Sequence, residues 1–420
     1  MSNTQKKNVP ELRFPGFEDE WEEKKVGELL EFKNGLNKGK EYFGSGSSIV
    51  NFKDVFNNRS LNTNNLTGKV NVNSKELKNY SVEKGDVFFT RTSEVIGEIG
   101  YPSVILNDPE NTVFSGFVLR GRPKSGIDLI NNNFKRYVFF TNSFRKEMIT
   151  KSSMTTRALT SGTAINKMKI IYPVSAKEQK KIGDFFSKLD RQIELQEQKL
   201  ELLQQEKKGY MQKIFSQELR FKDENGEDYP DWKEKKLGDI TEQSMYGIGA
   251  SATRFDSKNI YIRITDIDEK SRKLNYQNLT TPDELNNKYK LKRNDILFAR
   301  TGASTGKSYI HKEEKDIYNY YFAGFLIKFE IDEQNNPLFI YQFTLTSKFN
   351  KWVKVMSVRS GQPGINSEEY AKLPLVLPNK LEQQKIAEFL DRFDQQIELE
   401  KQKIEILQQQ KKGLLQSMFI

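Results

Sequence analysis

Two segments of the chain carry apolar residues at alternating steps of three and four, which is the pattern of helices in a coiled coil. The segments span residues 176–216 and 380–420, and neither contains a proline. At about 1.5 Å per residue, each helix is expected to be roughly 60 Å long. The apolar residues that we expect at the helix–helix interface are Ile182, Leu189, Ile193, Leu200 and Leu203 in the first segment and Ile386, Phe393, Ile397, Ile404 and Leu407 in the second.

Polar residues interrupt both apolar seams at the same two places. These residues are Gln196 and Lys207 in the first segment and Glu400 and Lys411 in the second. Matched polar positions set the register of paired helices, so we expect the two helices to pair with each other. Antiparallel pairing would relate the two halves of the chain by an approximate two-fold axis, whereas parallel pairing would crowd them at one end. The alternative is that each helix packs only on its own globular unit.

The chain repeats itself. Residues 178–215 and 382–419 align without a gap, and more than half of the aligned residues are identical. Weaker repeats follow in the same order, such as "FSGFVL" from Phe114 and "FAGFLI" from Phe322. The chain is therefore predicted to be a tandem duplication of a globular unit followed by a helix. The predicted domains are 1–175 with an N-terminal arm at 1–20, the helix 176–216, the second unit 217–379 and the helix 380–420.

Each globular unit mixes short apolar runs with turns rich in Asn, Gly and Ser. The runs "DVFFT", "FVLRG", "KIIYPV", "IYIRIT", "DILFA", "FLIKFE" and "LPLVLP" predict strands. Residues 131–148 and 336–353 predict one helix in each unit. We expect a mainly antiparallel sheet with a few packed helices, which is an α+β fold. Trp21 and Trp232, at the start of the two units, are expected to anchor the cores.

The stretch "GASTGKS" at 302–308 resembles a phosphate-binding loop but differs from one in two respects. Only three residues separate Gly302 from Gly306, whereas the nucleotide loop needs four. The residues that follow are aromatic and β-branched, which favours a strand over the required helix. In the first copy the equivalent stretch contains no Gly-Lys-Ser, so a strand followed by a variable turn is the simpler interpretation.

Composition narrows the possible chemistry. The 420 residues carry a formal net charge of +10, which suits a partner rich in phosphate. The chain contains no cysteine, which excludes disulfides and thiolate zinc sites and fits a cytoplasmic protein. Its only histidine, His311, lies in a polar context and is expected to be a solvated surface residue. We find no apolar signal segment and no run long enough to span a membrane.

The candidate contact residues lie in loops that follow strands and occur in both copies. Arginine can donate two parallel hydrogen bonds to guanine, while Lys, Ser and Thr position phosphates. For each arginine the alternative is an ordinary surface salt bridge. The candidates are Arg91, Thr92 and Arg157 in the first unit and Arg300, Thr301, Ser304, Lys307, Arg359 and Gln362 in the second.

Motifs for catalysis are incomplete. "NPLF" at 336–339 has Leu338 where adenine methyltransferases carry a proline, and "PDWKEKK" at 230–236 is too tightly spaced for a nuclease site. No catalytic or metal-ligating residue is therefore assigned.

This layout resembles the specificity subunit of type I restriction-modification systems, the HsdS family. The resemblance rests on the paired Glu-Gln-x-Lys-Ile helices and on the openings at Trp21 and Trp232, and it covers nearly the whole chain. It implies two α/β target recognition domains, separated by two long antiparallel helices, that read the two halves of a split site in double-stranded DNA. It also implies a non-catalytic chain whose partners are two modification and two restriction subunits. S-adenosylmethionine, ATP and magnesium would then belong to those partners, and none to this chain.

Two other functions remain possible from the residues alone. The first is a stand-alone bipartite DNA-binding or architectural protein without enzyme partners. The second is a self-sufficient nuclease or NTPase built on "GASTGKS" or "PDWKEKK", in which Lys307→Ala would abolish activity.

Overall fold

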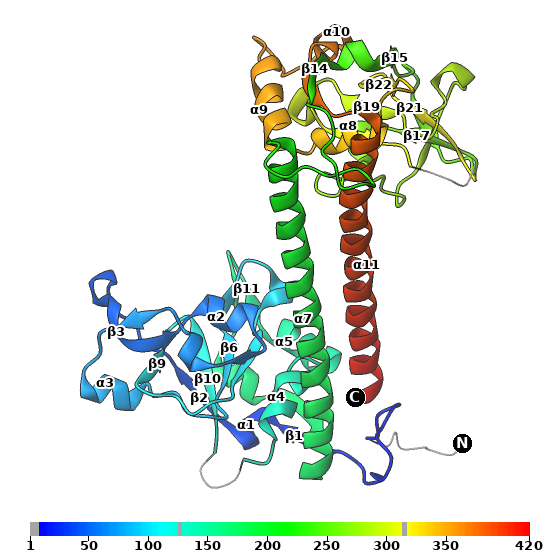
Figure 1. The fold of residues 1–420 in the computed structure, drawn as a ribbon. Helices are drawn as coiled ribbons and strands as arrows, with labels where there is room; N and C mark the ends of the chain where they lie inside the picture. Colours follow the sequence, from blue (N-terminus) through cyan, green and yellow to red (C-terminus); the bar gives the residue numbers. More distant parts are fainter. Residues whose placement is uncertain (1–7, 125–127, 313–316) are drawn as a thin grey trace, which may run out of the picture. The chain divides into compact units, whose positions relative to one another are not determined.

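The computed structural model describes residues 8–124, 128–312 and 317–420, so residues 1–7 of the predicted arm lie outside the described residues. The chain forms two compact units. Unit 1 comprises Met1–Gln198 and Gln402–Ile420, and unit 2 comprises Lys199–Lys401. The long helices α7 (Ala176–Phe215) and α11 (Lys380–Met418) each contribute to both units (Figure 1). Each unit is therefore completed by a piece of chain distant in sequence.

Unit 1 is built on a five-stranded sheet in the order β2-β10-β6-β8-β4. Only the β4–β8 pair is parallel; the other pairs are antiparallel. Two three-stranded sheets, β5-β3-β9 and β11-β12-β7, and the pair β1-β13 complete it. The strands are β1 (Glu22–Lys25), β2 (Leu30–Asn34), β3 (Phe43–Val50), β4 (Ser60–Leu61), β5 (Lys69–Val70), β6 (Val87–Thr90), β7 (Thr92–Ser93), β8 (Pro102–Ile105), β9 (Thr112–Phe114), β10 (Val118–Pro123), β11 (Ser153–Met154), β12 (Ala158–Leu159) and β13 (Lys169–Tyr172).

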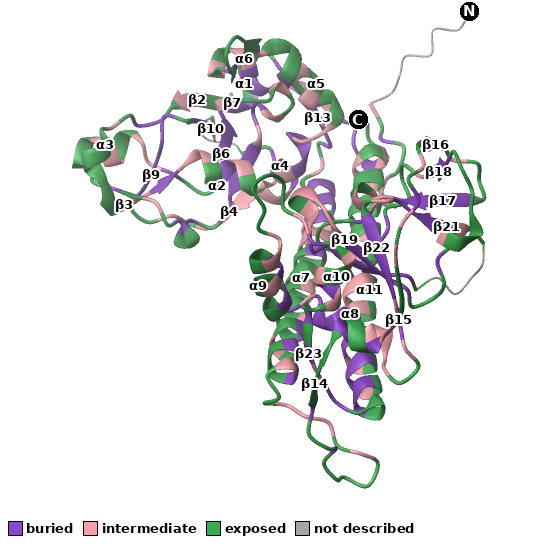
Figure 2. Ribbon diagram, turned by 90° about the horizontal axis from the view of Figure 1, so that it is seen from above, coloured by how far each residue is buried: buried purple, intermediate pink, exposed green. Residues whose placement is uncertain are grey.

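Unit 2 repeats this topology with a four-stranded antiparallel sheet in the order β15-β22-β19-β20. Strands β19 and β22 at its centre are buried (Figure 2). The parallel pair β17-β21 corresponds to β3-β9, and β14-β23 corresponds to β1-β13. The strands are β14 (Lys233–Lys236), β15 (Thr241–Tyr246), β16 (Ala252–Arg254), β17 (Asn259–Ile262), β18 (Thr280–Pro282), β19 (Ile296–Ala299), β20 (Ser308–Ile310), β21 (Asn319–Phe322), β22 (Leu326–Ile331) and β23 (Pro374–Leu377). The predicted duplication and the mainly antiparallel sheets are confirmed.

Short helices cover the sheets. The helical state predicted at 131–148 and 336–353 is confirmed, but each segment is divided into two helices. Thr141 and Thr346 stand at the break, and each side-chain hydroxyl accepts a hydrogen bond from the backbone N–H three residues later, which caps a new helix. The helices are α1 (Val26–Leu29), α2 (Phe52–Asn57), α3 (Ser74–Asn79), α4 (Asn132–Val138), α5 (Asn142–Lys151) and α6 (Gly162–Asn166) in unit 1 and α8 (Pro337–Phe343), α9 (Ser347–Met356) and α10 (Ser367–Ala371) in unit 2.

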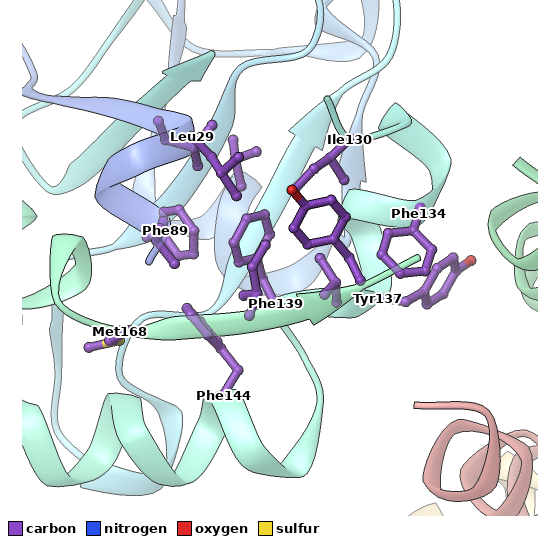
Figure 3. Packing of buried hydrophobic residues seen from close by; sticks show 14 of the residues in the cluster. Leu29, Phe89, Ile130, Phe134, Tyr137, Phe139, Phe144 and Met168 are labelled. Atoms are coloured by element: carbon purple, nitrogen blue, oxygen red, sulfur yellow. The ribbon is translucent and has the colours of Figure 1, made fainter. Parts of the chain in front are cut away.

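Aromatic side chains fill the core between the sheet of unit 1 and these helices (Figure 3). Phe89 of β6 meets Phe139 edge to face at 5.4 Å between ring centroids, and Phe139 meets Phe144 in the same way at 5.3 Å. Offset and edge-to-face contacts add roughly 0.5–1.5 kcal/mol per pair to the gain from burial. Trp21 and Trp232 are buried as expected, and each belongs to the main core of its unit.

The two long helices pair in opposite directions within each unit. In unit 1 the last turns of α11 bring Phe419 against Phe186 of α7 and against Trp21. In unit 2 the last turns of α7 bring Tyr210 against Phe389 near the start of α11, at 5.1 Å between ring centroids. The predicted antiparallel coiled coil is confirmed, and the alternative of two independently packed helices was wrong. All ten predicted interface residues are buried or half-buried.

The polar residues of the seam form ion pairs between the helices. Lys207 of α7 donates to Asp394 of α11 over 2.6 Å in unit 2, and Lys411 of α11 pairs with Asp190 of α7 in unit 1. Asp190 and Asp394 are equivalent positions of the repeat, as are Lys207 and Lys411. An antiparallel pair of repeated helices therefore makes the same contact twice.

The repeated Glu-Gln at the start of each long helix ties the helix to its own unit. The Gln179 carboxamide accepts the Asn131 N–H at 2.7 Å, and Gln383 accepts the Asn336 N–H at 2.8 Å. Both glutamines also donate to the carbonyl of a proline, Pro173 or Pro378. These buried bonds explain why this part of the repeat is nearly identical in the two copies.

The glutamate of that motif accepts two hydrogen bonds from an arginine in the segment before the first strand of its unit. Arg13 donates twice to Glu178, at 2.6 and 2.8 Å, and Arg220 donates twice to Glu382, at 3.1 and 2.8 Å. The predicted arm therefore packs on α7 through Arg13.

His311 is buried, so its prediction as a surface residue was wrong. Its imidazole lies 4.6 Å from the ring of Tyr320, measured between centroids, and the Tyr309 hydroxyl lies 3.1 Å from its Nδ1. His311 directly follows strand β20 and is buried with it, which the polar residues after it did not indicate. In the described part of the chain, every helix is too short or too polar to cross a bilayer.

Candidate nucleic-acid interface

In unit 1 the structure brings the predicted contact residues together at the end of β6. Arg91 follows this strand, and its backbone N–H donates to the Phe117 carbonyl at 3.1 Å while its own carbonyl accepts the Thr160 N–H. Thr92 begins β7, which pairs with β12, and the Arg157 loop lies between β11 and β12. The Arg157 side chain is 65% exposed and lies 3.7 Å from Glu94, too loosely held to be immobilised.

Unit 2 repeats the arrangement at the end of β19. The Arg300 backbone N–H donates to the Phe325 carbonyl at 3.1 Å, and the Arg300 carbonyl accepts the Ile365 N–H at 2.9 Å. The Arg300 guanidinium donates through Nε to the Gly324 carbonyl and lies 5.0 Å from the centre of the Tyr246 ring. Its counterpart Arg91 makes a longer bond, 3.5 Å, to the Gly116 carbonyl. Both arginines are thus held by the same turn of their own unit.

The loop that carries Arg359 and Gln362 lies beside Arg300, because Thr301 bridges to Gly364. Gln362 is exposed. Arg359 is also exposed, but its guanidinium donates to both oxygens of Glu369, at 2.6 and 2.5 Å, and to two backbone carbonyls. A base contact by Arg359 would require these bonds to break, whereas Arg157 is free to reorient.

Lys307 does not lie on the surface, which contradicts its prediction as a DNA contact. Its side chain is 7% exposed and donates to the Ile267 carbonyl at 3.2 Å and to Glu269 at 2.6 Å. The hydrogen bond from Lys307 is the main reason that the pKa of Glu269 lies below its ordinary value. Ser304 is half-buried in a single 3-10 turn, Gly302–Ser304, and strand β20 follows where a nucleotide loop would need a helix. The interpretation of this stretch as a strand and a turn is confirmed.

Two exposed aromatic residues were missed. Phe117 and Phe325 occupy equivalent turns, after β9 and after β21, and are 65% and 60% exposed. Their carbonyls are the acceptors for Arg91 and Arg300. The repeat of "SGF" and "AGF" in the sequence was a signal for this pair. It did not indicate that the phenylalanine that ends each stretch, Phe117 or Phe325, points to solvent. In each unit the backbone of the arginine is therefore hydrogen-bonded to the backbone of an exposed phenylalanine.

The arrangement suits recognition. Arginine and threonine side chains carry donors of the kind that contact base edges and phosphate oxygens. The two units share the backbone frame and differ in the adjacent side chains, with Ser93 and Glu94 in unit 1 against Gly302 and Ala303 in unit 2.

Curated proteins are similar in sequence to part of this chain. The chain is 28% identical to the type I restriction enzyme HindI specificity subunit of Haemophilus influenzae over 201 residues, which is 45% of this chain and 41% of that protein. It is 26% identical to the type I restriction enzyme MjaIX specificity subunit of Methanocaldococcus jannaschii over 236 residues, or 53% of this chain and 51% of the relative. The chain thus spans about half the length of the curated relatives it matches.

Solved structures share the fold at low sequence identity. The S subunit of a type I restriction-modification system from M. genitalium superposes with a TM-score of 0.64 at 15% identity, over 98% of this chain and 99% of that one. A chain from a study of complex assembly and conformational transition of the type I R-M system gives a TM-score of 0.52 at 13% identity, covering 97% and 98% of the two chains.

The family model of the type I restriction modification DNA specificity domain matches twice, at residues 18–205 and 229–409. Each match contains one globular unit with the long helix that follows it. The chain therefore belongs to the family of type I restriction modification DNA specificity domains, with two copies of the domain in tandem.

Proposed function

We propose that this chain is the specificity subunit of a type I restriction-modification system and reads a split site in double-stranded DNA, one half with each unit. The observation that carries the proposal is the arginine after β6 and after β19, held by the same turn in both units but surrounded by different side chains. One frame with two sets of variable neighbours is what reading two different half-sites requires. The net charge of +10 supports a polyanionic partner.

The long helices would set the distance between the half-sites. Each unit is tied to the antiparallel pair by α7 and by α11, through the Glu-Gln motif and through the Lys–Asp pairs. A spacer of this kind allows only half-sites separated by a fixed length of duplex, and linkage of two weak sites raises the overall affinity.

The chain itself would be non-catalytic. Two modification subunits, which use S-adenosylmethionine, would methylate an adenine in each half-site, and two restriction subunits would use ATP and magnesium to cleave DNA. The names of the relatives, which are specificity subunits of type I restriction enzymes, support these partners. A cytoplasmic location follows from the proposed substrate.

The test is to map methylated adenines across a genome with and without this gene expressed beside the modification subunit. We expect new methylation at one split sequence. A chain that binds DNA but neither co-purifies with a methyltransferase nor directs methylation would be the stand-alone DNA-binding protein instead.

The spacer is tested by removing the matched heptads 195–201 and 399–405, which are equivalent in the repeat and close to each other in the pair, since Lys199 contacts Glu400. The loss of seven residues shortens a helix by about 10 Å, or roughly 3 base pairs of duplex. We expect a shorter spacer between unchanged half-sites. Altered half-sites would contradict the idea that the helices act only as a ruler.

A further inference from the structure

Phe117 and Phe325 are large apolar side chains that the fold holds in solvent at equivalent positions. They are 65% and 60% exposed, although exposure of so much apolar surface brings no gain in folding. Their rings project from the turns that join β9 to β10 and β21 to β22. Because both units keep an aromatic residue at this place, the exposure calls for a ligand.

Hydrogen bonds fix the turn in unit 1 on several sides. The Gly116 N–H donates to the Leu36 carbonyl at 2.8 Å, and the Val118 N–H donates to the Ser115 carbonyl at 3.1 Å. The Phe117 carbonyl accepts a hydrogen bond from the backbone N–H of Arg91. The backbone that carries the Phe117 ring is thus set before any ligand arrives.

Unit 2 holds its turn in the same way. The Gly324 N–H donates to the Ile248 carbonyl at 2.8 Å, and the Leu326 N–H donates to the Ala323 carbonyl at 2.8 Å. The Phe325 carbonyl accepts a hydrogen bond from the backbone N–H of Arg300. The agreement of all three bonds between units shows that the turn is a conserved element of the duplicated fold.

A glycine beside each turn makes the packing tight. A Cβ on Gly35 would lie 2.1 Å from the Ser115 carbonyl oxygen, and one on Gly247 would lie 2.3 Å from the Ala323 carbonyl oxygen. The backbone of the glycine thus packs directly on the backbone of the turn in each unit, so neither turn can move towards its glycine. Because the backbone of each turn is already fixed, binding has to order only the side-chain torsions of the phenylalanine, which keeps the entropic cost low.

We propose that Phe117 and Phe325 are apolar wedges that enter the base stack of the DNA, one in each half-site, beside the arginines that read it. The inference rests on the proposed function and adds a step to it. A base must leave the stack before it can be methylated, and unstacking is costly in a closed duplex. Phenylalanine side chains of DNA-bending proteins offset this cost by inserting between base steps. An exposed phenylalanine on a fixed turn, whose backbone is bonded to that of an arginine, has the chemistry for such a contact, because each base offers an aromatic face.

The experiment uses the full-length chain and a duplex that the wild-type protein selects from a random pool. The adenine analogue 2-aminopurine is placed in turn at each adenine of the two half-sites, and its fluorescence rises when it unstacks. We expect the wild type to raise the fluorescence at one position or more in each half. Phe117→Ala should abolish the rise in one half only and Phe325→Ala in the other, with binding weaker by roughly tenfold for the loss of one stacking contact.

Matched controls separate a wedge from a general loss of apolar surface. Val174→Ala in unit 1 and Val355→Ala in unit 2 remove side chains that are 64% and 73% exposed and lie outside the turns, and they should change neither readout. An abasic nucleotide at the responsive position removes the stacking cost, so the wild type should bind that duplex more tightly than the intact one. Phe117→Ala should lose this preference in its half.

The outcomes are distinct. Unchanged fluorescence and affinity within twofold in both phenylalanine variants would overturn the inference and leave the proposed function standing. Normal DNA binding with loss of a co-purifying methyltransferase would assign the rings to a protein contact and would equally overturn it. A wild type that selects no split duplex would overturn both.

Discussion

Lys207 and Asp394 form an ion pair, and we expect removal of Lys207 and removal of Asp394 to lower the stability of the protein by very different amounts. The Lys207 side chain is 10% exposed and that of Asp394 is 32% exposed, with 2.6 Å between Nζ and Oδ1. Asp394 also accepts a hydrogen bond from Gln342 at 2.8 Å. Lys207→Met therefore leaves a carboxylate that keeps one donor and some water, whereas Asp394→Ala leaves a buried ammonium without its carboxylate.

The magnitude follows from these exposures. With an effective dielectric constant of about 20, the attraction at this distance is about 6 kcal/mol, and dehydration of the two charges offsets most of it. Loss of one partner from a fully buried pair costs about 3–5 kcal/mol, and the partial exposure of Asp394 places Asp394→Ala at about 3 kcal/mol. For Lys207→Met we expect about 1–2 kcal/mol. The double variant Lys207→Met/Asp394→Leu should cost less than the sum of the two single variants, because no charge is left behind. The buried Gln342 amide loses its acceptor, so a cost of about 1–3 kcal/mol remains.

The assay is thermal unfolding of the full chain by calorimetry. A loss of 3 kcal/mol in a unit of this size corresponds to a fall in Tm of about 6–12 °C. The equivalent pair Lys411–Asp190 is the matched comparison, since Asp190 also accepts hydrogen bonds from Tyr137 and Arg136. Burial lowers the pKa of Lys411, and the nearby Arg59 adds to this effect, so Lys411→Met should cost less than Lys207→Met. Equal costs for Asp394→Ala and Lys207→Met, together with a double variant equal to their sum, would refute the reasoning.

Three further predictions concern the recognition surface and unit 2. Arg91→Ala should relax specificity in one half-site and Arg300→Ala in the other, each by about 1–3 kcal/mol in a methylation or binding assay, and uniform weakening on all sequences would mark phosphate contacts instead. Lys307→Ala should lower the Tm of unit 2 because it removes a side chain that is only 7% exposed and its hydrogen bond to the Ile267 carbonyl, while a loss of ATP hydrolysis without a loss of stability would revive the NTPase alternative. Partial burial raises the pKa of Asp256, but hydrogen bonds from the Asn259 and Lys258 N–H groups outweigh it, and the pKa falls to about 2. The folded pKa lies below the unfolded one, so this contribution to stability is complete above about pH 4 and is lost as the pH falls towards 2; Asp256→Asn should flatten that part of the acid-unfolding profile.

The long helices were predictable because their information is local and periodic. Apolar steps of three and four define the buried face of a helix whatever lies opposite, and the repeat at Glu178 and Glu382 revealed the duplication directly. The break inside each of the helical segments 131–148 and 336–353 was missed for the opposite reason. Both halves of each segment favour helix, and the break depends on a threonine that caps the next helix.

Local patterns also failed where burial depends on the partner. Lys307 and His311 stand in polar sequences, yet both are buried. Lys307 directly precedes β20 and bonds to the Ile267 carbonyl, and His311 directly follows β20 and packs on Tyr320. Phe117 and Phe325 stand in apolar runs, yet the turn leaves each ring exposed to solvent. Whether such a side chain is buried depends on which other element packs over it. That element lies elsewhere in the chain.

Sequence alone was therefore sufficient for the duplication, the two long helices, the positions of Arg91 and Arg300 at the ends of strands, and the strands β6, β10, β13, β17, β19, β22 and β23, because periodicity and repetition are properties of the chain itself. Most of the other strands were not predicted. Tertiary structure decided which ends of the helices meet, how Lys207 and Lys411 find carboxylates, and which candidates reach solvent. These depend on contacts between residues about 200 positions apart, and no window of sequence holds both partners.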